Sequence, residues 1–190
     1  MILHEVSHGV VALAFGDDTA KRAGRITLNP IRHVDPFGTL ILPGLLALAG
    51  LPAFGWAKPV PVNVRKLRNP RQQSLYVSLA GPATNLLIAA VLAVAWQLWA
   101  TRLIGSFLGE LVFFAGLLNV VLALFNLLPI PPLDGSAILE RFLPDAWWPR
   151  YLVFRRWSIV GLLVLMLVVS SRGGSVIFEP ARWLWRQMAL

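Results

Sequence analysis

The chain has 190 residues, of which 57% are hydrophobic and only 14% are charged. A soluble globular domain usually carries about 25% charged residues, so this composition argues against a soluble fold. Lys and Arg outnumber Asp and Glu by 17 to 9, but the basic residues lie between apolar blocks, as in the loops of membrane proteins. No nucleic-acid-binding motif is present, and we expect no nucleic-acid partner. Because cysteine is absent, a thiolate zinc site is excluded.

The apolar blocks predict an all-α, polytopic membrane protein with about four to five membrane helices or re-entrant segments. Residues 1–15 predict a helix that is shorter than the roughly 20 residues needed to span a bilayer. A free amino group at that depth would be costly, so we expect the front of this first helix to precede residue 1. Three later windows have spanning length, at 74–100, 108–129 and 151–170. We treat residues 1–190 as one domain.

The polar links predict short β elements between the helices. Residues 24–28 are typical of a short strand, and residues 53–73 are typical of an extended or hairpin segment. The apolar segment 38–52 lies between two basic links. The positive-inside rule favours a segment that dips into the membrane and returns, which leaves both links and residues 130–156 in the cytoplasm. A kinked short span is the alternative.

The sequence His4-Glu5-Val6-Ser7-His8 is an HExxH motif. Residues four apart share one face of a helix, so His4 and His8 can bind the same zinc ion. Glu5 is rotated by about 100° from His4, and it can therefore act as a general base beside the metal without serving as a ligand. Ionisable residues in an apolar membrane helix are functional by default. The motif predicts one Zn²⁺ per chain.

Catalytic zinc usually takes three protein ligands and one water, so a third ligand is needed. His33 and Asp35 are candidates, but both lie in a polar turn. Asp134 is the stronger candidate because it follows an apolar helix, where an unpaired carboxylate is hard to justify. The prolines before it break the helix, and such a segment is tolerated in a membrane where it lines a watery cavity.

Other polar and small residues have two interpretations each. Asn126 can stabilise an oxyanion with its amide, or it can cap a helix or bond between helices. His33 can hydrogen-bond near the metal, although a solvated turn is the more common setting for a loop histidine. Gly81, Pro82 and Asn85 are more typical of close helix packing than of substrate contact.

Five motifs resemble those of the site-2 protease family of intramembrane zinc metalloproteases, in its compact prokaryotic form without a PDZ or CBS domain. They are HEVSH at 4–8, NPIRHVDPFGT at 29–39, FGWAKPVPVN at 54–63, AGPATN at 80–85 and NLLPIPPLDG at 126–135. The resemblance implies that His4, His8 and Asp134 bind zinc and that Glu5 is the catalytic carboxylate. It also implies a prokaryotic cell membrane as the location, with transmembrane proteins as substrates.

We therefore expect a zinc-dependent intramembrane endopeptidase that hydrolyses peptide bonds in or near transmembrane segments. An extended substrate could add to a strand edge at 24–28 or 54–63. Two alternatives stay open, namely an inactive membrane scaffold of the same fold and an ion or metal transporter. Transporters often contain repeated halves, whereas this sequence has no internal repeat. The lipid bilayer is the other expected partner, and the sequence carries no signal for an oligomeric state.

Overall fold

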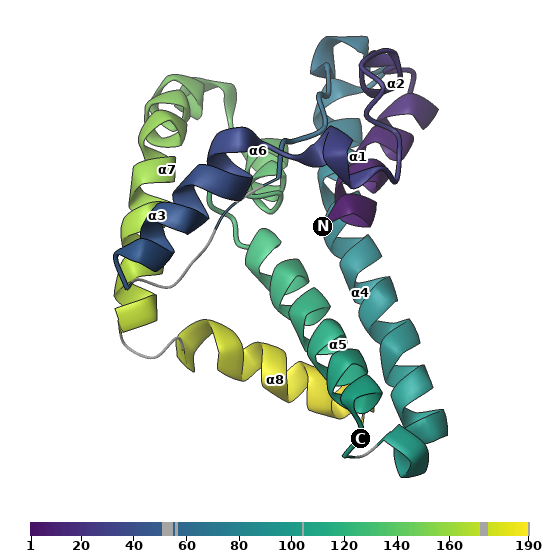
Figure 1. Cartoon of the computed structure of the whole chain (residues 1–190). Coiled ribbons are helices and arrows are strands. Elements are labelled where there is room, and N and C mark those ends of the chain that lie inside the picture. Colours follow the sequence, from purple (N-terminus) through teal and green to yellow (C-terminus); the bar gives the residue numbers. More distant parts are fainter. Residues whose placement is uncertain (51–54, 56, 104, 172–174, 190) are drawn as a thin grey trace. The chain divides into compact units, whose positions relative to one another are not determined.

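The computed structural model describes residues 1–50, 55, 57–103, 105–171 and 175–189. Throughout these ranges the regular elements are helices, which confirms the predicted all-α class. The chain divides into two compact units, Met1–Gly81 and Pro82–Leu190. Helix α4, Pro70–Leu103, runs through the boundary between them (Figure 1).

The first unit contains short helices joined by irregular segments. Helix α1 covers Ile2–Ala14 and α2 covers Thr19–Arg22. A 3₁₀ turn at Pro30–His33 is followed by a π-helical stretch at Pro36–Ile41, which leads directly into α3 at Leu42–Leu48. A second 3₁₀ turn at Val64–Lys66 precedes α4.

The second unit contains most of α4 and four further helices among the described residues. They are α5 at Phe107–Asn126, α6 at Ser136–Phe142, α7 at Trp148–Ser171 and α8 at Ser175–Ala189. A 3₁₀ turn at Asp145–Trp147 leads into α7.

Within the described ranges, two helices are long and apolar enough to cross a membrane. They are α4 over Pro70–Trp99 and α5 over Phe107–Asn126, which contain most of the predicted windows 74–100 and 108–129. The window 151–170 is helical as part of α7, but that this window crosses a membrane stays a prediction. The re-entrant path of residues 38–52 also stays a prediction, and its last two residues lie outside the described part of the chain.

The predicted strands are wrong for the residues that the structure describes. Residues 24–28 form a turn and bends, and residues 57–63 are irregular, without a ladder partner. Pro59 and Pro61 remove two backbone donors, which disfavours a ladder. Arg25 bonds the carbonyls of Lys58 and Pro59 through its side chain. Residues 53, 54 and 56 of the predicted hairpin lie outside the described residues.

Small residues let the first unit pack tightly around α1. A Cβ at Gly9 would lie 3.2 Å from Ala20, Ile26 and Val60, so the absence of a side chain brings these three residues against the helix. Ala20 and Val60 are buried in consequence. The extended segment that contains Val60 is therefore seated on α1 by apolar packing.

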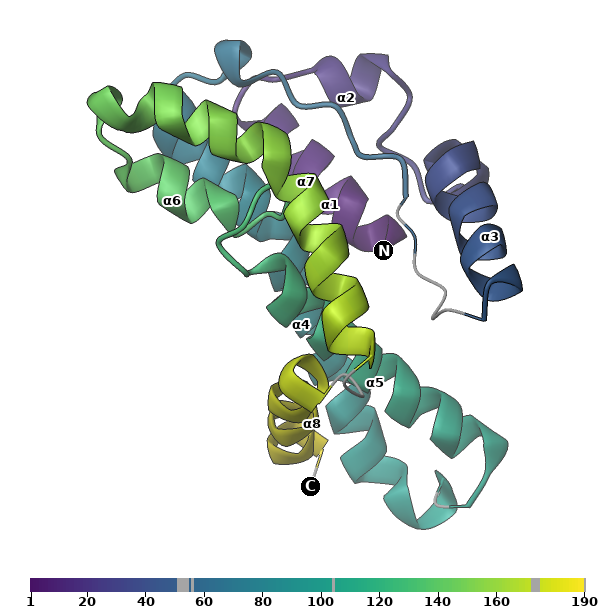
Figure 2. The same ribbon diagram turned by 90° about the vertical axis from the view of Figure 1, so that its left-hand side faces the viewer.

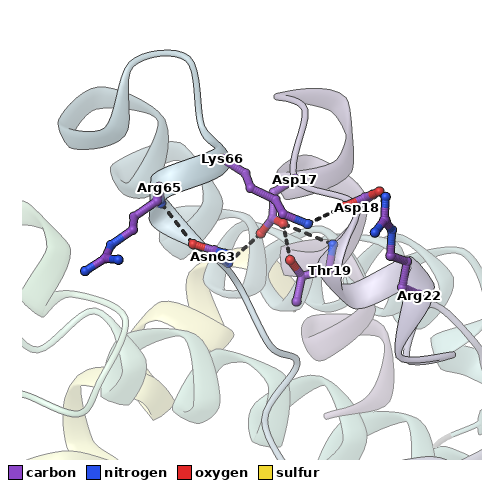
Figure 3. A network of polar contacts seen from close by, with 7 residues as sticks. All are labelled: Asp17, Asp18, Thr19, Arg22, Asn63, Arg65 and Lys66. Atoms are coloured by element: carbon purple, nitrogen blue, oxygen red, sulfur yellow. Dashed lines mark hydrogen bonds and ion pairs between the residues drawn. The ribbon is translucent and has the colours of Figure 1, made fainter.

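A polar network ties the end of α1 to the segment that precedes α4 (Figure 3). Asp17 is fully buried, and its Oδ2 accepts a hydrogen bond of 2.6 Å from the Asn63 amide. Its Oδ1 accepts bonds from the amide and hydroxyl of Thr19. Burial alone would raise the pKa of Asp17, but these hydrogen bonds favour the carboxylate and hold its pKa below the usual value. Asp17 thus stays charged at neutral pH and anchors this segment.

Helix α8 was not predicted from the sequence, yet it supplies half of the buried core cluster of the second unit. Ala181, Trp185 and Ala189 from α8 pack with Ala89, Ala93 and Val120 from α4 and α5. Figure 2 shows α8 beside α5. The Trp185 ring is fully buried and contacts Phe113 edge-on at a centroid distance of 5.8 Å. It also lies directly over Gly116, where a Cβ would overlap the ring.

Substituting Ala for Gly116 should therefore destabilise the second unit. Overpacking costs about 1–3 kcal/mol, which exceeds the roughly 0.5–1 kcal/mol that Ala gains over Gly in a helix. Thermal unfolding in detergent, followed by tryptophan fluorescence, should show a lower midpoint. Gly161→Ala is the matched control because a Cβ there has open space within α7. Equal midpoints for the two variants would contradict the packing of α8 on α5.

Candidate metal centre

The two histidines of the HExxH motif lie on the buried face of α1. His4 is 7% exposed and His8 is 8% exposed. Their rings meet edge to face, with centroids 4.8 Å apart. One helical turn separates the two residues, so both imidazoles project from the same face, as the spacing predicts.

A backbone carbonyl fixes the orientation of one imidazole. Nδ1 of His8 lies 2.6 Å from the Val77 carbonyl oxygen. Because a carbonyl can only accept, Nδ1 carries the proton and Nε2 of the neutral ring keeps its lone pair. Metal-binding histidines almost always use one ring nitrogen in this way. The bond to α4 therefore prepares His8 to bind a metal through Nε2.

Gly81, one turn after Val77 on α4, leaves room beside both rings. A Cβ at this position would lie 2.5 Å from Nε2 of His8 and 2.6 Å from Nε2 of His4. The candidate ligand nitrogens of the two histidines lie within 4.8 Å of each other. Zinc binds histidine at about 2.0–2.1 Å and is well suited to imidazole. The absence of a side chain at Gly81 thus lets the α4 backbone lie beside both Nε2 atoms, and this pair of imidazoles fits a zinc ion.

Glu5 lies beside the histidine pair and contacts a different element. Its Oε2 accepts a hydrogen bond of 3.0 Å from the Val60 amide. The donor belongs to the extended segment that packs on α1 through Gly9. A backbone amide holds the carboxylate at this point of the helix surface. Glu5 is thus oriented by a neighbouring segment, independently of the two imidazoles.

Asp134 belongs to the second unit, in the loop between α5 and α6. The Gly135 amide donates to the Asn126 carbonyl at 2.7 Å, which closes this loop onto the end of α5. The Asp134 carbonyl accepts from the Ala137 amide at the start of α6. The side-chain amide of Asn126 donates to the Leu122 carbonyl at 2.9 Å, which is a bond within α5 and not one between helices. That Asp134 completes the histidine pair stays a prediction, and so does an oxyanion role for Asn126.

The alternative third ligands already have structural partners. Asp35 caps the π-helical stretch, where its Oδ1 accepts from the Gly38 amide at 2.7 Å, as turn chemistry predicts. His33 is 3% exposed, so a solvated turn is the wrong description of it. It is buried because Nε2 bonds the Thr27 carbonyl at 2.9 Å and its own carbonyl accepts from the Lys58 amide. A role near the metal for His33 stays a prediction.

Comparison with known proteins identifies the family. The model of peptidase family M50 matches residues 101–169. Several relatives share the name "putative zinc metalloprotease". YwhC of Bacillus subtilis is 43% identical over 171 residues, which cover 87% of this chain and 75% of the relative. The chain belongs to peptidase family M50. Rip2 of Mycolicibacterium smegmatis is 33% identical, covering 97% of this chain and 69% of the relative.

The M50 relatives include an archaeal protein, MJ0611 of Methanocaldococcus jannaschii, which is 31% identical over 85% of this chain and 70% of its own length. No solved structure gives a match. Membership of M50 confirms the predicted site-2 protease family and the enzyme class, a zinc metalloprotease with Zn²⁺ as its metal. The two apolar helices agree with the predicted membrane location of this M50 protein.

Two parts of this centre were not assigned from the sequence. The sequence indicates helix packing for Gly81 and carries no signal for Val77. Both act through the backbone of α4, the first by lacking a side chain and the second through its carbonyl. The motif AGPATN signalled a close approach but did not identify the neighbour. That neighbour is the histidine pair, more than 70 positions earlier in the chain.

Placing a methyl group at residue 81 should displace both imidazoles and lower zinc content. Gly81→Ala puts a carbon within 2.6 Å of both Nε2 atoms, much closer than a van der Waals contact of about 3.5–4.0 Å. Metal analysis of the purified protein measures the effect. Gly44→Ala in α3 is the control because a Cβ there meets no atom within 4 Å. Full zinc occupancy in the Gly81 variant would show that the open volume beside the rings is not used by the metal.

Proposed function

We propose that this M50 protein is an intramembrane endopeptidase that hydrolyses peptide bonds in or near the transmembrane segments of other proteins. The observation that carries the proposal is the preparation of His4 and His8 on α1, with His8 held by Val77 and the Nε2 atoms of both rings beside Gly81. The apolar character of α4 and α5 supports a multi-pass protein of a prokaryotic cell membrane. Transmembrane substrates and the bilayer are its partners in this proposal.

In the proposed centre, His4, His8 and Asp134 would hold one zinc ion. Zinc supplies a Lewis acid that polarises the scissile carbonyl and activates water near neutral pH. Asp134 contributes an oxygen ligand from the loop after α5, where the bond between Gly135 and Asn126 fixes the backbone. The carboxylate balances part of the metal charge in an apolar setting.

Glu5 is the proton carrier of the proposed reaction. One carboxylate oxygen, Oε2, is bound to the Val60 amide, and we assign proton transfer to the other oxygen, Oε1. Glu5 accepts a proton from the attacking water and delivers it to the leaving amine. The substrate must be extended at the cleavage site because the carbonyls of a helix are already hydrogen-bonded. Asn126 is the candidate donor to the developing oxyanion.

Removing the base without removing the metal tests the role of Glu5. Glu5→Gln keeps the size of the side chain but cannot accept the proton, so kcat for a model transmembrane substrate should fall by about 10²–10⁴-fold. Zinc content should not change because Glu5 is not a ligand. The same exchange at Glu110, an exposed residue in the first turn of α5, is the matched control. Undiminished cleavage by the Glu5 variant would refute the assignment of the base.

Removing the proposed third ligand tests the metal centre. Asp134→Ala should lower the zinc content and abolish cleavage because two imidazoles alone hold the ion weakly. Metal analysis after mild chelation measures the loss. Asp145→Ala, at an exposed aspartate before α7, should keep its zinc. If the Asp134 variant retains one tight zinc per chain, Asp134 is not the third ligand, and the result points instead to Asp35 or His33.

A further inference from the structure

Arg25 is a buried cation that bonds backbone carbonyls. Arg25 is only 7% exposed. Nη1 donates to the Arg32 carbonyl, and Nη2 donates to the carbonyls of Lys58 at 2.5 Å and Pro59 at 3.3 Å. Burying a charge is expensive unless polar partners compensate for it. The guanidinium group therefore fixes two separate stretches of backbone with respect to each other.

Two of the three carbonyls bonded by Arg25, those of Lys58 and Pro59, come just before the amide that bonds Glu5. Lys58 and Pro59 are followed by Val60, whose N–H donates to Oε2 of Glu5 at 3.0 Å. The Lys58 amide also donates to the His33 carbonyl at 2.9 Å. The position of the Val60 amide thus depends on where Arg25 and His33 hold residues 58 and 59.

The same segment is anchored on the other side of Val60 by Asp17. The Asn63 amide donates to Oδ2 of Asp17 at 2.6 Å, as Figure 3 shows. Asp17 is fully buried and also bonds Thr19. Residues 58–63 are therefore fixed at both ends across α1, with the amide that faces Glu5 between the two anchors.

We propose that Arg25 is a positioning residue for the catalytic base, acting on Glu5 through the backbone of residues 58–60. This inference rests on the proposed function because it takes Glu5 to be the base. Arg25 touches neither the histidines nor the reacting atoms in this proposal. It determines the position of the Val60 amide, and that amide determines the direction of the Glu5 carboxylate.

The key variant is Arg25→Gln, which removes the charged fork but keeps a polar side chain. A carboxylate displaced by about 1 Å can cost 10²-fold in rate, so we expect kcat to fall about 10- to 100-fold with KM unchanged. Zinc should stay at one per chain, and the thermal midpoint should show that the protein is folded. Arg25→Lys should have an intermediate kcat. Arg32→Gln removes an exposed arginine side chain from the same region and is the matched control.

A second pair of variants isolates the amide itself. Val60→Pro removes the N–H and keeps apolar bulk, whereas Val60→Ala keeps the N–H and loses the bulk. The Pro variant should lower kcat as Arg25→Gln does, and the Ala variant should lower kcat less. Combining Arg25→Gln with Val60→Pro should add little further loss because both changes break the same link.

Hydrogen exchange supplies a readout that does not depend on proteolysis. Pro59 and Pro61 have no amide hydrogen, so a peptide over residues 57–63 reports few amides besides that of Val60. Exchange in this peptide should accelerate in Arg25→Gln and not in Arg32→Gln. Unchanged exchange in Arg25→Gln would overturn the inference, whatever the activity.

The kinetic outcomes separate the two proposals. If wild-type protein cleaves and Arg25→Gln keeps its full kcat, the positioning role is refuted while the proposed function stands. Loss of zinc together with activity in a folded Arg25→Gln protein would also refute it, because the residue would then support the metal centre as a whole. If wild-type protein with its zinc does not cleave, or Glu5→Gln cleaves normally, the proposed function fails, and exchange alone decides whether Arg25 fixes the Val60 amide.

Discussion

The hydrogen bond from His8 to the Val77 carbonyl is the constraint on which the centre depends. It joins α1 to α4 across 69 positions of sequence and fixes the tautomer of His8 in the same contact. Gly81 then brings the α4 backbone close enough to leave both Nε2 atoms facing one small volume. A side chain at residue 81 would separate the helices or fill that volume. The close packing of α1 on α4 and the space for a metal beside the imidazoles therefore depend on the same small residue.

The helices could be predicted from the sequence because length and apolar content act locally. Residues 1–15, 74–100 and 108–129 were predicted well for this reason. The strands were predicted wrongly because alternation in residues 24–28 and 53–73 resembles a half-buried ladder. In the structure, buried side chains replace the missing strand partner, with Arg25 bonding carbonyls and Asp17 bonding the Asn63 amide. Such long-range side-chain contacts leave no periodic signal. Helix α8 was missed although its buried residues Ala181, Trp185 and Ala189 recur every four positions, which is helical spacing.

For the candidate site, the sequence predicted that His4, Glu5 and His8 lie together but not what orients them. The HExxH spacing was enough to place His4, Glu5 and His8 together because one helix determines their geometry. The orienting groups are backbone atoms, namely the Val77 carbonyl and the Val60 amide. Backbone atoms are identical at every position, so residue identity does not reveal them. Gly81 is the exception, since only its lack of a side chain could have pointed to the contact.

Residues 58–62 have two edges with different chemistry, and this bears on how a substrate could pair there. In an extended chain, successive amides point to opposite sides. The amides of Lys58 and Val60 are used by His33 and Glu5, whereas Pro59 and Pro61 have none to offer on the other side. A substrate strand at that second edge would find no amide donor, and it would have to donate to the Pro61 carbonyl because Arg25 already bonds the Pro59 carbonyl. Such one-sided pairing favours a short unwound stretch of substrate over a long ladder. The prolines that prevent this segment from joining a sheet would thus also limit how much substrate it can bind.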